Sequence, residues 1–310
     1  MISAFGLAVE LALDVPELEA APPVRHDLLP SGPPLRVQMA AAEELDTAWS
    51  GPATPAVESG ALVDGSRWHA ERGRSGDLRM EHVLGRFHLD PAATLLRCAP
   101  SDAADPAWRR LLLDTALVSA SLARGREALH AACVVSAGVA VAIAGPSEAG
   151  KTTLMAELMR AGADFLADDV VALADGELGV LALPGPPVSN LPTSSPADDL
   201  AERLHRFGDE WWVRMRRPCL SPAPLRVVLV LDRPGAPAGP QPVFRLQETA
   251  AVLLGHALQS GAAPRRREQR FALLARLAQD VEVLAVNVDR SRSPRQLVEA
   301  LQEAVPLLQA

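Results

Sequence analysis

The chain has 310 residues, 48% hydrophobic and 22% charged, which fits a folded globular protein and excludes wholesale disorder. Acidic residues outnumber basic ones by 38 to 30, and the net charge of −8 argues against a nucleic-acid coat. Cys98, Cys133 and Cys219 are too scattered for a disulfide framework or a zinc knuckle, and they favour a cytoplasmic protein. The longest low-polarity run, 134–144, is shorter than the roughly 20 residues of a membrane span, so we expect no membrane partner.

The first third of the chain differs in pattern from the remainder. Residues 1–105 are rich in proline and glycine and contain short alternating segments at 35–39, 78–83 and 86–89, which predict a β-rich N-terminal module. Residues 106–310 follow as a second domain. This domain opens on a helix with Asp105 as its N-cap and continues with two short strands that form a hairpin, 128–135 and 139–144.

Helix and strand patterns alternate through the rest of the second domain, which indicates an α/β fold. We expect strands at 165–173, 225–231, 243–246 and 281–286, and helices at 152–161, 248–259, 268–279 and 294–308. Five prolines between 184 and 196 predict a loop there. Ser293 and Gln296 can form a capping box at the start of the last helix.

The strongest motif lies between the hairpin and the helix at 152–161. It matches G-x-x-x-x-G-K-[ST], the phosphate-loop pattern, and an apolar strand precedes it. Backbone N–H groups of such a loop and of the helix start bind phosphates, the lysine contacts the β- and γ-phosphates, and the threonine hydroxyl binds Mg²⁺. We therefore expect ATP and Mg²⁺ as cofactors, bound by Gly145, Pro146, Ser147, Glu148, Ala149, Gly150, Lys151, Thr152 and Thr153.

Lys151 is the only lysine among the 30 basic residues of the chain. Arginine serves everywhere else, so the retained ammonium group indicates a task that a guanidinium cannot perform, such as a point charge in a tight phosphate pocket. The acid at position 148 is unusual beside phosphates, and its role stays open.

Asp168 and Asp169 lie in the strand expected after the phosphate-loop helix. That helix carries the chain roughly 15 Å from the phosphates, and a return strand brings the two carboxylates back. Neighbouring residues of a strand face opposite sides, so we expect one acid to act as general base and the other to face the metal. The spacing alone does not say which acid takes which role.

His130 gains interest from the hairpin. A two-residue turn at Ala137 and Gly138 places His130 opposite Gly145, the first glycine of the loop. A histidine there could orient a carboxylate or stabilise transferring charge, and a core histidine is the alternative.

Three segments, in this order and spacing, resemble the kinase domain of HPr kinase/phosphorylase and its HPr-kinase-like relatives: 129–132 (LHAA), 145–152 (GPSEAGKT) and 166–170 (LADDV). The resemblance implies a P-loop kinase-like fold and ATP-dependent phosphorylation of a serine on a protein or peptide. By position, it implies that Asp168 is the base, that Asp169 joins Thr152 at the metal, and that His130 and Lys151 complete the catalytic group.

The sequence also departs from that family. The E-[IVL]-R-G segment that follows the acid pair in true HPr kinases is missing, so the chain is more similar to HPr-kinase-like proteins of peptide pathways, such as lasso-peptide tailoring kinases. The alternative function is a nucleotide-binding regulatory ATPase or switch that has no hydroxyl acceptor. The acceptor, and whether the chain forms a homo-oligomer, stay open.

Overall fold

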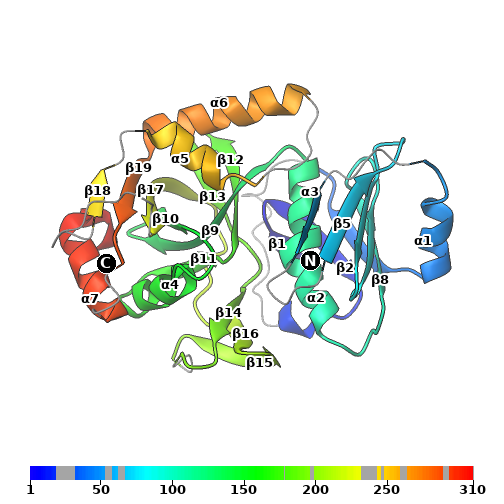
Figure 1. The fold of residues 1–310 in the computed structure, drawn as a ribbon, viewed down its shortest axis with the longest axis horizontal. Helices are drawn as coiled ribbons and strands as arrows, with labels where there is room; N and C mark the ends of the chain where they lie inside the picture. The colour runs from blue at the N-terminus through cyan, green and yellow to red at the C-terminus, as the bar shows by residue number, and fades with distance from the viewer. Residues whose placement is uncertain are drawn as a thin grey trace. The chain divides into compact units, whose positions relative to one another are not determined.

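The structure is a computed structural model, and it divides the chain into two compact units, Met1–Arg126 and Glu127–Leu258 with Pro264–Ala310. Figure 1 shows the helices and strands of both units. The described residues are 1–18, 32–52, 58–61, 67–177, 179–195, 199–231, 243–245, 248–258, 264–288 and 293–309.

The first unit contains one eight-stranded sheet in the order β1-β2-β3-β8-β7-β6-β5-β4. Its strands are β1 (Ile2–Ala4), β2 (Leu7–Ala12), β3 (Leu35–Met39), β4 (Glu58–Ala61), β5 (Arg67–Arg72), β6 (Leu78–His82), β7 (Gly85–Leu89) and β8 (Leu95–Pro100). The short helices η1 (Pro16–Leu18) and α1 (Ala42–Ala48) lie between strands in the chain. The three strands expected from the alternating pattern correspond to β3, β6 and β7.

A helical segment completes the first unit and consists of α2 (Ala107–Leu111), a π-helix (Leu112–Ala116) and α3 (Leu117–Ala123). Asp105 accepts a hydrogen bond from the Ala107 N–H at 2.9 Å, as expected of a cap. Ser121 donates to the Phe5 carbonyl at 2.7 Å, which ties α3 to the turn between β1 and β2. The compact units consequently divide after Arg126, later than the boundary expected between 105 and 106.

The second unit is built on a mixed sheet in the order β10-β9-β12-β13-β17-β19-β18. Its strands are β9 (Glu127–Ser136), β10 (Val139–Ala144), β11 (Asp164–Ala167), β12 (Val170–Gly176), β13 (Gly179–Leu183), β17 (Ala223–Leu231), β18 (Val243–Arg245) and β19 (Glu282–Val286). β10 also pairs with β17, in parallel, so the strand that leads into the loop 145–150 has a partner on each side. The expected α/β character of this half is confirmed.

The hairpin of β9 and β10 has the expected register, with Val139 paired to Ser136 and Ala144 to Ala131. Ala137 and Gly138 have φ values of 48° and 78°, the left-handed pair that a type I′ turn requires. His130 precedes Ala131 on β9, so in this register it lies opposite Gly145, the first residue of the loop.

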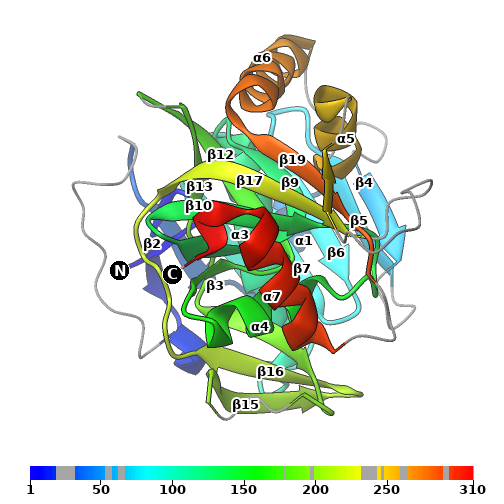
Figure 2. The ribbon, with the colours of Figure 1, turned by 90° about the vertical axis from the view of Figure 1, so that its left-hand side faces the viewer.

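Helices cover both faces of this sheet (Figure 2). They are α4 (Lys151–Arg160) and α7 (Pro294–Ala304, followed by a 3-10 turn) on one face, and α5 (Thr249–His256) and α6 (Pro264–Asp280) on the other. Ser293 and Gln296 form the expected capping box at the start of α7. None of the helices in the described ranges is long and apolar enough to cross a bilayer.

A separate three-stranded sheet, in the order β14-β16-β15, packs on the other side of α4. It contains β14 (Val188–Pro192), β15 (Ala201–Phe207) and β16 (Glu210–Met215). The prediction of a loop from 184 to 196 is therefore wrong in its middle. Four residues without proline precede Pro192, the last residue of β14, and they pair with β16 as an ordinary strand.

Candidate functional site

β10 leads into the loop 145–150, and α4 begins directly after it. Gly145 and Gly150 have φ values of 154° and 96°, which only glycine adopts easily. A Cβ on Gly145 would lie 3.2 Å from the Leu231 Cβ and 3.3 Å from the Ala149 Cβ, so a side chain there would crowd both neighbours. The loop can therefore turn tightly and direct backbone N–H groups toward an anion at the N-terminus of α4.

The Lys151 side chain folds back over this loop. Its ammonium group donates to the carbonyls of Gly145 at 3.1 Å and Pro146 at 3.0 Å, and only 9% of the residue is exposed. Burial lowers the pKa of the ammonium group, and the nearby carboxylates of Asp169 and Asp168 oppose this shift. The single lysine is thus a buried cation beside two acids.

The Asp168 carboxylate lies against the start of α4. Its Oδ1 atom is 3.3 Å from the Thr152 hydroxyl, which donates to it, and its Oδ2 atom accepts from Ser189 at 2.5 Å. Burial raises the pKa of the Asp168 carboxyl, and the hydrogen bond from Ser189 works in the opposite direction. Asp168, Thr152 and Lys151 therefore lie together, as the sequence predicts.

Asp169 has a different environment from its neighbour. Its carboxylate lies 3.3 Å from Nδ1 of His130, and the two side chains are 56% and 35% exposed. The strand expected over 165–173 is interrupted at this pair: Asp168 and Asp169 form a bend between β11 and β12, and Asp169 has a φ of +64°. The two carboxylates therefore point in different directions because of a bend, and not because side chains alternate along a strand.

The contacts of the two acids differ from those that the resemblance implies. Thr152 contacts Asp168 rather than Asp169, and His130 pairs with Asp169. Sequence reasoning also missed Ser189, because it lies in the segment expected to be a loop. A short run without proline between Pro187 and Pro192 was the one available signal for a strand there.

The other expected loop residues divide by exposure. Ala149 is buried in the core, whereas the side chains of Pro146, Ser147, Glu148 and Thr153 are exposed. An exposed loop residue can direct its backbone N–H at a phosphate, so exposure excludes none of these residues from a phosphate site. Glu148 has a φ of +63°, a strained conformation for a residue with a Cβ.

The donor set suits a hard divalent cation. A hydroxyl and a carboxylate oxygen are the ligand types that Mg²⁺ prefers, with the remainder supplied by water and phosphate. Among the described side chains, no group of three or more His, Cys, Asp and Glu is placed to hold a metal without such help. The residues therefore fit a metal that enters with a nucleotide.

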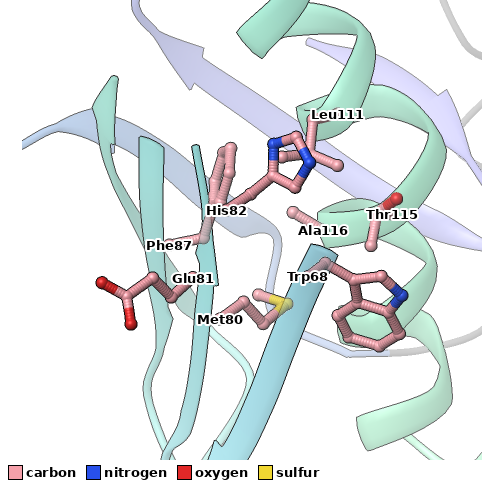
Figure 3. Close-up of a pocket in the computed structure, with 8 residues that line it drawn as sticks. All are labelled: Trp68, Met80, Glu81, His82, Phe87, Leu111, Thr115 and Ala116. Atoms are coloured by element: carbon pink, nitrogen blue, oxygen red, sulfur yellow. The ribbon is translucent and has the colours of Figure 1, made fainter. Parts of the chain in front are cut away.

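A small pocket lies in the first unit, between the sheet and the helical segment (Figure 3). Its lining is mainly apolar and includes Trp68, Met80, Phe87 and Leu111, with the buried His82 among them. None of the residues expected to carry chemistry lines it.

No protein-family model and no curated protein matches the chain. One solved structure similar to it is the Hpr(Ser) kinase/phosphatase from Coxiella burnetii. The identity is 15% and the TM-score 0.35, over 58% of this chain and 96% of that one. The likeness is distant, so the function is inferred from the geometry of this chain's own residues.

Proposed function

We propose that this protein binds ATP together with Mg²⁺ and transfers the γ-phosphoryl group to a serine hydroxyl of a protein or peptide. The observation that carries the proposal is the meeting of Lys151, Thr152 and Asp168 at the N-terminus of α4. A buried ammonium group, a hydroxyl and a carboxylate at the end of a glycine-rich loop are the groups that phosphoryl transfer needs.

Binding of the triphosphate would use the loop first. The helix N-terminus and the loop N–H groups favour a negative charge, and the side chain of Glu148, the acid within the loop, is exposed. Without a nucleotide, Lys151 donates to two loop carbonyls. With ATP bound, it would donate to phosphate oxygens instead, which are charged and form stronger hydrogen bonds.

Thr152 and Asp168 would hold the cation. Mg²⁺, when bound, neutralises charge that accumulates on the transferred phosphoryl group and the leaving diphosphate. The role of Asp168 is then to keep an ionised oxygen beside the Thr152 hydroxyl.

His130 and Asp169 would face the acceptor. Asp169 is the more exposed of the two acids, and an imidazole orients its carboxylate. The serine hydroxyl would donate its proton to Asp169 while its oxygen forms the new bond to phosphorus and the bond to the ADP oxygen breaks. This assignment gives the base role to Asp169 and the metal role to Asp168, the reverse of what the resemblance implies.

The test uses ATP labelled in the γ-phosphate and an array of serine-containing peptides. Label on a peptide, lost in Lys151→Ala, is the expected result. Label that appears only as inorganic phosphate would favour the nucleotide-hydrolysing switch. No binding of ATP by the wild-type protein would contradict both functions.

A further inference from the structure

β14 contributes two adjacent hydrogen-bond donors to Asp168. The Ser189 hydroxyl donates to Oδ2 at 2.5 Å, and the backbone N–H of Asn190 also donates to the carboxyl group. Ser189 is 2% exposed, so neither water nor another protein can readily replace it. A strand of the three-stranded sheet thus reaches a carboxylate that belongs to the bend beside the main sheet.

The hydrogen-bond alternation of β14 explains this geometry. The Met215 N–H donates to the Pro187 carbonyl and the Thr193 N–H to the Asp209 carbonyl, so the odd-numbered residues bond to β16. The backbone groups of Asn190 therefore point away from β16, toward Asp168. The Ser189 side chain shares a face with Leu191, which belongs to the hydrophobic cluster around α4.

The Asp168 carboxylate has different partners at its two oxygen atoms. It lies in the bend between β11 and β12, where the next residue has a positive φ. Its Oδ1 atom accepts from the Asp169 N–H at 3.0 Å and from Thr152, which leaves Oδ2 as the atom that fixes the rotation of the carboxylate. Ser189 is the side chain that holds Oδ2.

We infer that Ser189 is a positioning residue, which orients Asp168 so that its other oxygen stays beside the Thr152 hydroxyl as a metal ligand. This inference rests on the proposed function. In this inference, β14 of the three-stranded sheet orients the metal ligand Asp168, whereas the loop 145–150 and Lys151 bind the phosphates.

The test measures Mn²⁺ binding to the full chain saturated with ADP, by electron paramagnetic resonance, alongside ADP affinity measured without metal. In Ser189→Ala we expect the Mn²⁺ dissociation constant to rise about tenfold, since a hydrogen bond to a charged group is lost. The metal-free ADP affinity should change less than twofold. Thr193→Ala, which removes a hydroxyl four residues further along the chain, just after β14, should leave both values unchanged.

A second variant guards against misfolding. Ser189→Cys keeps nearly the same volume with a weaker donor, so its Mn²⁺ affinity should lie between those of wild type and Ser189→Ala. Wild-type Mn²⁺ affinity in either folded variant would overturn the positioning role and leave the proposed function intact. A wild-type protein that binds neither ADP nor Mn²⁺ would overturn both.

Discussion

The ammonium group of Lys151 lies against the loop that precedes α4. This side chain, the only lysine of the chain, donates to the carbonyls of Gly145 and Pro146 from a buried position. A compact ammonium group fits there, whereas a planar guanidinium requires more room and a different donor geometry.

Replacement of Lys151 tests this point. Lys151→Ala should weaken ATP binding by about 100-fold, since hydrogen bonds from a cation to phosphate are lost. Lys151→Arg, which keeps the charge, should recover less than half of the binding free energy. Isothermal titration measures both, and an arginine variant that binds like wild type would contradict the argument from shape.

Asp169 carries the prediction about proton transfer. Without an acceptor peptide, water can take the place of the acceptor hydroxyl, and the reaction releases phosphate from ATP. Asp169→Asn should lower the rate of this release by about 100-fold or more, because the general base is lost. ATP affinity should stay within twofold of wild type, because the phosphate and metal contacts remain. An equal loss of affinity and rate would place this acid at the metal instead.

Glu148 adopts a left-handed conformation in the loop at a φ of +63°. Glu148→Gly should therefore raise the free energy of unfolding by about 1 kcal/mol, through relief of backbone strain. Glu148→Ala serves as the control, because it removes the charge and keeps the strain. Urea denaturation without nucleotide measures the change, and equal effects of both variants would exclude strain as the cause.

Among the residues of the site, the sequence placed Lys151, Thr152 and the two acids near one another, but it predicted neither their pairing nor the contact of Ser189 with Asp168. The motif spacing brings Asp168 and Asp169 to the loop, since helix and return strand have similar lengths. The positive φ of Asp169 leaves no mark on the sequence, because glycine, the usual sign, is absent there. The contacts of the two acids therefore occur at a bend that the sequence pattern did not predict.

At the scale of elements, the hairpin of β9 and β10 was the most predictable feature. A Gly in the turn and apolar runs of matching length on either side fixed its register. β14 was not predictable in the same way, because its partner β16 does not follow it directly and β15 lies between them in the chain. The π-helix between α2 and α3 contains no proline or glycine from which it could have been predicted.

The hairpin turn offers a stability prediction. Ala137 occupies a left-handed position that Asn tolerates better, so Ala137→Asn should raise the free energy of unfolding by about 0.5–1 kcal/mol. Gly138→Ala should lower it, because φ is +78° there, although a Cβ would meet no atom within 4 Å. Thermal and urea unfolding measure both changes, and stabilisation by Gly138→Ala would contradict the turn assignment.

At the scale of the whole molecule, every residue proposed to contact ATP lies in the second unit. The sequence predicted two parts but placed their boundary before the helical segment, because the stripe of apolar residues on that helix does not say which sheet it covers. The hydrogen bond from Ser121 to the Phe5 carbonyl shows that this helical segment belongs with the first unit.

Hydrogen exchange can test this division of labour. Saturating ATP with Mg²⁺ should slow amide exchange in the loop, α4 and β11, since a ligand that binds only the folded state stabilises what it touches. The strands β1 to β8 should exchange at unchanged rates. Protection that is equally strong in the first unit would show that nucleotide binding is not confined to the second.

The most direct measurement is the affinity for ATP with Mg²⁺ and with a chelator, in the wild-type protein and in Asp168→Asn. If Lys151, Thr152 and Asp168 serve one metal–nucleotide site, chelation should weaken wild-type binding about tenfold or more, and the variant should bind equally with and without metal. A variant that keeps the full response to Mg²⁺ would contradict that site.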